Sequence, residues 1–374
     1  MINIDRLKKR VLDVLFQPFD VSAPRVEPDE VLHLGDDPAL FDSDRNAPPQ
    51  QGDPAILIYD DATMWPAQSV ARRGEALAFD TFIDEARVQH LDNLNALRHY
   101  PCIRHRGWAT TIDSVYPTQN YYHFLVDALP RVWALRHPKL QNLDITLFLA
   151  RPLDPEKKNI VQSLLPSSVS IRRVHRFSQV YADHYIHLPY LSKDRVAYSD
   201  TRVETSAGFL PQEYIEYFRR FMLERHGDSS MPSGTERIYV TRRGASMRRL
   251  KNEVAVVEYL ESRGFQTVAL EEYTMEEQAR LFSTARAVVA QHGAALANLI
   301  YMPRGRLIEI FSSPDRPQYY SQYAGTMGLD YTAITLGRTW KNADVHLPLD
   351  ELDRALTRIG FSDSPDQAGN TVVH

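Results

Sequence analysis

Two stretches of this chain combine residue types that can carry chemistry. The first, residues 286–311, places His292 and Gly293 after a Val-rich apolar run and sets an acidic residue, Glu309, inside a second apolar run. A short apolar run followed by glycine and helix formers, here from Ala294 onward, is typical of a buried strand that turns into a helix. The free N–H groups of such a helix start bind anions. This stretch therefore predicts a phosphate cradle with a histidine at its edge and a carboxylate close by.

The second stretch reads NYYHFLVDALPRVWAL. His123 and Asp127 are four residues apart, so on a helix they share a face and can hydrogen-bond. A carboxylate that fixes the tautomer of a histidine makes a base that can take a proton near neutral pH. Asn120 suits the N-cap of this helix, and Pro130 should kink or restart it just before Arg131. An ordinary surface salt pair is the alternative interpretation.

A basic run lies upstream of the first stretch. Between residues 236 and 251 six basic residues accompany one acid, in a chain whose net charge is −5. The run begins where an expected strand ends, and arginine suits bidentate contacts with phosphate. Arg242, Arg243 and Arg249 are therefore candidate anion ligands, with a solvated basic loop as the alternative interpretation.

Alternating strand and helix patterns must position these residues. After residue 236 we expect, in order, strand 238–241, helix 252–263, strand 266–270, helix 275–284, strands 286–290 and 306–311, helix 318–328 and strand 331–334. Such alternation predicts a parallel sheet covered on both faces, hence a Rossmann-like domain whose ligands bind at the carboxyl ends of the strands. Upstream we expect strands 55–59, 144–150, 169–174 and 179–188, and helices 155–165 and 211–226.

A segment rich in Gly, Ser and Pro, residues 227–234, predicts a linker in a chain long enough for two domains. The expected domains are residues 1–227 and 235–345. They are followed by a helix within 346–361, for which a return to the first domain stays open, and by a flexible tail, 362–374.

Charge and composition exclude some classes of protein. The net charge of −5 argues against a nucleic-acid binder. The single cysteine, Cys102, excludes an intrachain disulfide and fits a reducing compartment, and we find no secretory signal or membrane-spanning run. Residues 1–16 are amphipathic and predict a helix that contacts a membrane surface or packs on its own domain. Asp42-Ser43-Asp44 resembles a metal-binding triplet, but no strand precedes it, so we expect an acidic loop and no metal site.

Three segments together resemble glycosyltransferase family 61, once called DUF563. YYHFLVDALPRVWAL is similar to its His-aromatic-x-x-Asp-x-Leu-Pro-Arg segment, and YVTRRGASMRRLKNE to its Ser-Arg…Arg…Asn-Glu segment, with Thr241 where serine is often seen. VVAQHGAALANLIYMPRGRLIEI is similar to its His-Gly-Ala…Asn…Pro-x-Gly…Ile-Glu segment and is the most specific match. The resemblance spans residues 120–311, and the 110 residues at the N-terminus match no family that we can name.

The resemblance implies a GT-B fold, in which two Rossmann-like α/β domains face each other across a cleft. It also implies an inverting glycosyltransferase (EC 2.4) that needs no metal or cofactor and moves a sugar from a nucleotide-sugar, UDP-linked in known relatives, to a glycan hydroxyl. Residues 1–227 would bind the acceptor and residues 235–345 the donor. The implied donor-binding residues are Arg242, Arg243, Arg249, Asn252, Glu253, His292, Gly293, Ala294, Asn298 and Glu309.

Within this set, Arg242 and Arg249 would contact the diphosphate and Glu309 the ribose hydroxyls. On the acceptor side either His123 or Asp127 would be the base, and Arg131 would line the cleft. The choice between the two bases stays open, because an unshifted aspartate is a weak base whereas histidine needs no shift.

The resemblance also favours a bacterial member of the capsule type. Such an enzyme would act on a glycan or lipid-linked glycan in the cytoplasm, with residues 1–16 in peripheral contact with the inner membrane. Two alternatives stay open: a GT-B-like nucleotide-sugar epimerase and a non-catalytic nucleotide-sugar binding protein.

Overall fold

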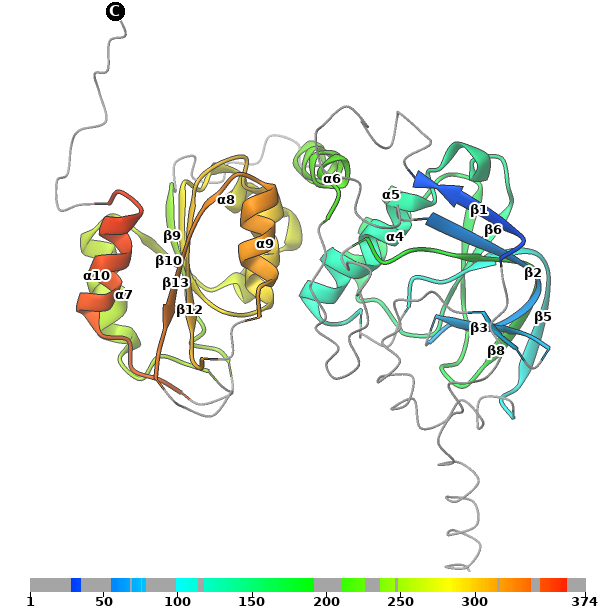
Figure 1. Ribbon diagram of the computed structural model, residues 1–374, viewed down its shortest axis with the longest axis horizontal. Helices are drawn as coiled ribbons and strands as arrows, with labels where there is room; N and C mark the ends of the chain where they lie inside the picture. The colour runs from blue at the N-terminus through cyan, green and yellow to red at the C-terminus, as the bar shows by residue number, and fades with distance from the viewer. Residues whose placement is uncertain are drawn as a thin grey trace, which may run out of the picture. The chain divides into compact units, whose positions relative to one another are not determined.

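The structure is a computed structural model in which the chain divides into two compact units, Met1–Tyr214 and Ile215–His374 (Figure 1). It describes residues 28–34, 55–67, 69–74, 76–78, 99–113, 118–191, 210–225, 236–245, 248–314, 317–337 and 344–361. The amphipathic segment 1–16, the Asp42–Asp44 triplet, the expected linker 227–234 and the tail 362–374 lie outside these residues.

Within the described residues, the N-terminal unit forms an eight-stranded mixed sheet in the order β4-β3-β2-β8-β5-β6-β7, with β1 paired to β2. The strands are β1 (Glu30–His33), β2 (Ala55–Trp65), β3 (Val70–Arg73), β4 (Ala76–Ala78), β5 (Cys102–Thr110), β6 (Ile145–Leu149), β7 (Val169–Arg173) and β8 (Gln179–His187). Strands β5 to β8 pair in parallel, as a Rossmann-like domain requires. Strands β1 to β4 pair antiparallel, which the expected doubly wound sheet does not include. The connections between β2, β3 and β4 are too short for the crossover that parallel pairing needs.

The helical elements of this unit are η2 (His123–Ala128), α4 (Leu129–Ala134), η3 (Pro138–Leu140) and α5 (Pro155–Leu164). The element η2 is a π-helix, and the winding changes to α one residue before Pro130, as the proline predicts. Asn120 accepts a hydrogen bond from the N–H of Tyr122 at 2.9 Å and so caps this helix, as expected.

The C-terminal unit forms a five-stranded sheet that is parallel throughout the described residues, in the order β10-β9-β11-β12-β13. The strands are β9 (Arg237–Val240), β10 (Gln266–Val268), β11 (Ala287–Gln291), β12 (Arg306–Phe311) and β13 (Asp330–Thr335). The helices are α6 (Gln212–Glu224), within which the two units meet in sequence, α7 (Glu253–Ser262), η4 (Leu270–Glu272), α8 (Met275–Thr284), η5 (Ala294–Tyr301), α9 (Tyr319–Thr326) and α10 (Leu349–Arg358). Figure 1 shows α7 and α10 on one face of this sheet and α8 and α9 on the other. The expected alternation and the α/β class are confirmed here.

Helix α10, for which a return to the first domain was open, packs beside α7 in the C-terminal unit. Its buried residues Leu352 and Leu356 share one hydrophobic core with Val256 and Leu260 of α7. The Asp353 carboxylate accepts a hydrogen bond from the Tyr259 hydroxyl at 2.6 Å. The core of this unit therefore extends beyond residue 345, where sequence analysis ended the domain.

The helix expected after Gly293 winds as a 3₁₀-helix, η5, rather than as an α-helix. All its residues from Leu296 to Tyr301 are buried, so contacts on every side set the winding in place of the intrinsic preference of Ala and Leu for the α-helix. Among the described helices none is both long and apolar enough to cross a bilayer.

Candidate functional site

The C-terminal sheet has one topological switch point within the described strands. The chain places β10 on one side of β9 and then β11 on the other side, so β9 and β11 are neighbours whose helices leave in opposite directions. Ligands of such sheets bind at the carboxyl ends of the strands at this point. Arg242 follows β9 and His292 follows β11, and the pairing of Val240 with Ala290 brings the two strand ends together.

The guanidinium of Arg242 lies directly against the backbone of Gly293. A Cβ placed on Gly293 would overlap Nη1 of Arg242. The backbone of Gly293 is extended, with φ of 170°, so glycine is required here for the close approach and not for backbone strain. The Tyr320 hydroxyl of α9 donates to the Gly293 carbonyl at 2.7 Å and fixes the other side of this turn.

A second arginine, Arg248, joins Arg242 at the switch point. The Nε atoms of both side chains are buried without a hydrogen-bond partner. Burial, followed by the nearby charge of Arg248, lowers the pKa of Arg242. None of the ion pairs found among the described residues includes either side chain. The Glu271 carboxylate lies near Arg242 without forming an ion pair with it, and two close guanidinium groups favour the binding of an anion.

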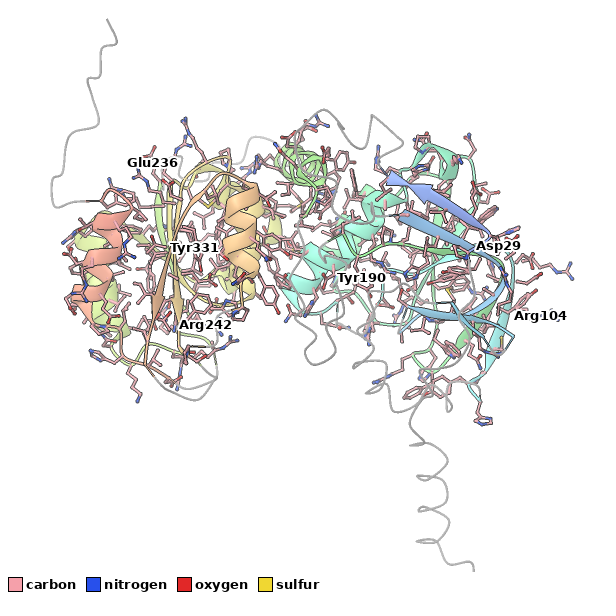
Figure 2. All side chains as sticks on the ribbon, viewed as in Figure 1. Asp29, Arg104, Tyr190, Glu236, Arg242 and Tyr331 are labelled. Atoms are coloured by element: carbon pink, nitrogen blue, oxygen red, sulfur yellow. The ribbon has the colours of Figure 1, made fainter. Side chains whose placement is uncertain are left out.

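His292, Glu309 and Tyr331 form a buried hydrogen-bonded chain beneath this cluster (Figure 2 labels Tyr331 and Arg242). The Glu309 carboxylate is 0% exposed, and its two oxygens accept from Nδ1 of His292 at 2.6 Å and from the Tyr331 hydroxyl at 2.7 Å. The His292 ring stacks on Phe311 with 5.1 Å between centroids. The contact of Glu309 with ribose hydroxyls that the resemblance implied stays a prediction, and in this structure both oxygens accept from protein groups. Glu309 fixes the orientation of His292.

A small pocket opens beside the ring of His292 at the ends of β11 and β12. Its polar lining comes from Arg248, Gln291, His292, Ser312 and Ser313. Gln291 donates to the Arg248 carbonyl at 2.7 Å and so supports the left-handed backbone of Arg248, whose φ is 58°. The other amide atom of Gln291, Oε1, is buried without a partner.

In the N-terminal unit the expected pairing of His123 and Asp127 is confirmed. Nδ1 of His123 lies 2.7 Å from Oδ2 of Asp127, and the carboxylate side chain is 4% exposed whereas the imidazole is 23% exposed. Both residues lie on the π-helix η2, whose wider turn brings residues four apart more nearly above one another. Single π-turns are frequent at functional sites, so this geometry suits a base held by a carboxylate.

Arg131, for which the resemblance implied a place in the acceptor cleft, is a buried residue of the N-terminal unit. Its guanidinium is fully buried and donates to the carbonyls of Leu188 and Asp113 and to the hydroxyl of Ser69. It also lies over the ring of Tyr190. Three of the five N–H donors of this guanidinium bind internal acceptors, so Arg131 holds three chain segments together.

Comparison with known proteins adds an independent observation. A family model described as Glycosyltransferase 61 matches residues 121–308. The chain belongs to glycosyltransferase family 61. The match begins just before His123 and includes Arg242, Arg248 and His292, so both candidate groups of this family 61 member lie within it.

The relatives of this family 61 chain include an animal enzyme from several species. This chain is 34% identical over 138 residues to protein O-linked-mannose β-1,4-N-acetylglucosaminyltransferase 2 of Mus musculus. It is 33% identical over 138 residues to the Homo sapiens protein and 28% identical over 140 residues to the Xenopus tropicalis protein. The mouse and human alignments cover 34% of this chain and 23% of the relative, so the chain spans about a quarter of the length of these relatives. The family and these relatives support a glycosyltransferase.

These relatives also correct the expected location of the family 61 chain. They are animal glycosyltransferases of the secretory pathway, which fits a lumenal location, so the expectation of a cytoplasmic enzyme is wrong. The single Cys102 misled that prediction: one cysteine cannot form an intrachain disulfide in any compartment and so carries little information about redox state.

Several of the sugar-donor-binding residues that the resemblance implied form internal contacts within the C-terminal unit. Nε and Nη2 of Arg249 both donate to Oδ2 of Asp344, at 3.1 and 2.8 Å, and the arginine side chain is about half exposed. The Asn252 amide exchanges two hydrogen bonds with the backbone of Leu347, at 2.8 and 3.0 Å. The diphosphate contact of Arg249 and the cleft position of Asn252 stay predictions, and in this structure both side chains bind internal partners.

Glu253, Asn298 and Arg243 also lie apart from the cluster. One oxygen of Glu253 accepts from the hydroxyls of Thr241 at 2.5 Å and Tyr239 at 3.0 Å, which holds the end of β9 in place. Asn298 is fully buried and donates to Gln278 of α8 at 2.9 Å, so it cannot line a cleft. Arg243 is exposed, and its N–H donates to the Thr241 hydroxyl.

Sequence reasoning missed three residues that the structure places at the site, Arg248, Gln291 and Tyr331. Arg248 lies in the basic run beside Arg249. Its left-handed backbone and the hydrogen bond from Gln291 place Arg248 rather than Arg249 at the site, and neither feature can be predicted from the sequence. Tyr331 begins an expected strand, and its hydroxyl reaches Glu309 because β12 and β13 are neighbours. A tyrosine one strand away from a buried acid was the available signal.

Proposed function

We propose that this chain transfers a sugar, with inversion, from a nucleotide diphosphate sugar to a hydroxyl of a glycan, and that its two units act in a GT-B arrangement. The observation that carries the proposal is the pair Arg242 and Arg248, whose Nε atoms are buried without a hydrogen-bond partner, beside His292 at the switch point of a family 61 chain. A diphosphate supplies the negative charge that this cluster favours.

In the proposed reaction the cluster stabilises the leaving group. As the bond between the anomeric carbon and the phosphate oxygen breaks, negative charge grows on the departing nucleoside diphosphate. The guanidinium groups of Arg242 and Arg248 and the free N–H groups at the start of η5 are fixed donors for that charge. They would replace a metal ion in this role.

The acceptor hydroxyl would be deprotonated by His123. Its oxygen forms the new bond to the anomeric carbon while its proton moves to Nε2 of His123, whose Nδ1 is held by Asp127. Histidine is favoured over Asp127 as the base because the aspartate side chain is 4% exposed and already accepts from the imidazole.

For the donor we propose UDP-N-acetylglucosamine, and for the acceptor a mannose-bearing glycan, on the names of the relatives. A glycan or lipid-linked glycan of bacterial surface polysaccharide is the second acceptor class. Residues 1–16 would provide contact with a membrane in that case.

The test is transfer by the full-length protein from a panel of UDP-sugars to mannosyl peptides and to lipid-linked glycans, read by mass spectrometry with and without a chelator. We expect one donor to give a product that the chelator does not abolish. Arg242→Gln and Arg248→Gln should lower kcat/KM by at least tenfold, whereas Arg249→Gln, which removes an arginine bound to Asp344, should leave it within twofold.

Three results would contradict the proposal. The release of an altered free sugar nucleotide without an acceptor would indicate an epimerase. Binding without turnover on any acceptor would indicate a binding protein. Equal loss of activity in all three arginine variants would remove the special role of the switch-point pair.

A further inference from the structure

His292 is the titratable side chain at the centre of the proposed donor site. Its Nδ1 is fixed by Glu309 at 2.6 Å, and Glu309 is fully buried with its second oxygen on Tyr331. The carboxylate accepts, so Nδ1 carries a proton, and Nε2 is the ring nitrogen that remains for a ligand in the pocket.

A phosphate oxygen at Nε2 can only accept a hydrogen bond. The ring must therefore carry protons on both nitrogens when it binds a diphosphate, and so it must be an imidazolium. We propose that donor binding is coupled to the uptake of one proton by His292. This inference rests on the proposed function and adds a regulatory property to the same site, namely a donor affinity that depends on pH.

The surrounding charges explain why the proton would arrive with the ligand. In the free protein a cationic His292 faces the guanidinium groups of Arg242 and Arg248, with Glu309 as the adjacent counter-charge. A diphosphate between these cations reverses the balance of charge and favours the imidazolium. The titratable and charged groups that face the ring or its partners are Glu309, Tyr331, Tyr319, Tyr320, Arg242, Arg248 and, beside Arg242, Glu271.

Aromatic side chains packed around the His292 ring hold it in one orientation. The imidazole stacks against Phe311 and Tyr319, with centroid distances of 5.1 and 6.4 Å, and its side chain is 18% exposed. The ring therefore cannot rotate away from the pocket to find another partner. Glu309 and Tyr331 act as positioning residues, since they touch the ring or its carboxylate and not the ligand.

The experiment is isothermal titration calorimetry of the full-length protein with UDP-N-acetylglucosamine, whose phosphate diesters carry no proton near neutral pH. Titrations in buffers of different ionisation enthalpy give the number of protons taken up. For the wild type we expect uptake of up to one proton, and a Kd that rises towards tenfold for each unit of pH over the range in which the imidazole of the free protein is neutral.

The sign follows from linkage. The bound form holds the proton and the free form loses it as pH rises, so affinity is greatest at low pH and falls at high pH. His292→Gln keeps a polar group but cannot titrate, and we expect no proton uptake and a flat pH profile. Glu309→Gln removes the charge but keeps an acceptor, so the fall in affinity should begin at a lower pH.

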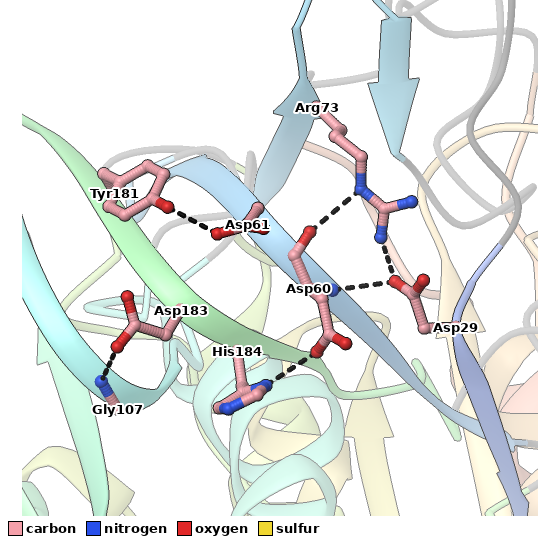
Figure 3. A network of polar contacts seen from close by, with 8 residues as sticks. All are labelled: Asp29, Asp60, Asp61, Arg73, Gly107, Tyr181, Asp183 and His184. Atoms are coloured by element: carbon pink, nitrogen blue, oxygen red, sulfur yellow. Dashed lines mark hydrogen bonds and ion pairs between the residues drawn. The ribbon is translucent and has the colours of Figure 1, made fainter.

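The chain provides a matched control in its other unit. Nδ1 of His184 lies 2.6 Å from Oδ1 of Asp60, and Figure 3 shows this pair in a polar network between β2 and β8. The pair has the same 2.6 Å contact through Nδ1 as His292 and Glu309, but it is more exposed and lies outside the proposed donor site. His184→Gln should therefore leave proton uptake unchanged.

Two results would overturn the inference alone: binding of UDP-N-acetylglucosamine without proton uptake, or uptake that persists in His292→Gln. Binding of neither UDP nor any UDP-sugar to folded wild-type protein would overturn the proposed function with it. Circular dichroism of each variant shows whether a changed result comes from the replaced side chain or from an unfolded protein. Should His292→Gln not fold, the wild-type proton count and the Glu309→Gln profile still decide the question.

Discussion

At the scale of single residues, the spacing of residues in the sequence predicted which side chains pair better than it predicted what those side chains do. His123 and Asp127 pair as a four-residue spacing on a helix predicts. Glu309 pairs with His292 across two strands, which the sequence could place close together but not join. Side chains such as Asn252 and Asn298 looked available for a ligand because their partners, Leu347 and Gln278, are distant in sequence.

Gly293 provides a test at this scale. Gly293→Ala places a methyl group where Nη1 of Arg242 lies, so the guanidinium must move while the extended backbone accepts alanine without strain. We expect nucleotide affinity to fall by at least tenfold with a change in the free energy of unfolding below about 1 kcal/mol. Gly325→Ala, where an added Cβ meets nothing within 4 Å, is the matched control. Unchanged affinity in Gly293→Ala would show that Arg242 does not bind the phosphates.

At the scale of elements, the periodicity of the sequence predicted the C-terminal unit well. Its strands are short apolar runs buried on both faces and separated by helices, so each element has a clear pattern. In the N-terminal unit only residues 55–59 of β2 were expected, because β2 carries Asp60 and Asp61 within its length. The antiparallel strands β3 and β4 and the parallel strand β5 were missed, and β5 alternates exposed and half-buried residues. The π-helix and the 3₁₀-helix η5 were also missed, since packing rather than sequence pattern sets their winding.

The hydrogen bonds between Asn252, just before α7, and the backbone of Leu347, just before α10, give a prediction at this scale. Asn252→Ala removes both hydrogen bonds to the backbone of Leu347 and leaves that N–H and carbonyl without their partner. We expect a loss of about 1–3 kcal/mol in the free energy of unfolding. Chemical denaturation measures this loss, and calorimetry should give an unchanged nucleotide affinity per folded molecule. A stable Asn252→Ala variant that fails to bind nucleotide would support the donor role that the resemblance implied.

At the scale of the whole molecule, family membership and the two-unit division are the firm results. The sequence predicted the family from three segments, and the matched region includes all of them up to residue 308. Location was the prediction that failed, because it relied on features such as a single cysteine that carry little physical information.

Three histidines in the described chain share one feature: His123, His184 and His292 each bind a carboxylate through Nδ1. A reagent that acylates imidazole can therefore attack only Nε2 on each of them. The side chains of His184, His123 and His292 are 37%, 23% and 18% exposed, so modification should proceed in that order. Peptide mapping after brief treatment with diethyl pyrocarbonate would follow all three at once, and a bound nucleotide should protect His292 while His184 continues to react. One modification experiment therefore reports on three places at once: His292 on the proposed donor site, His123 on the proposed base, and His184 as an internal reference.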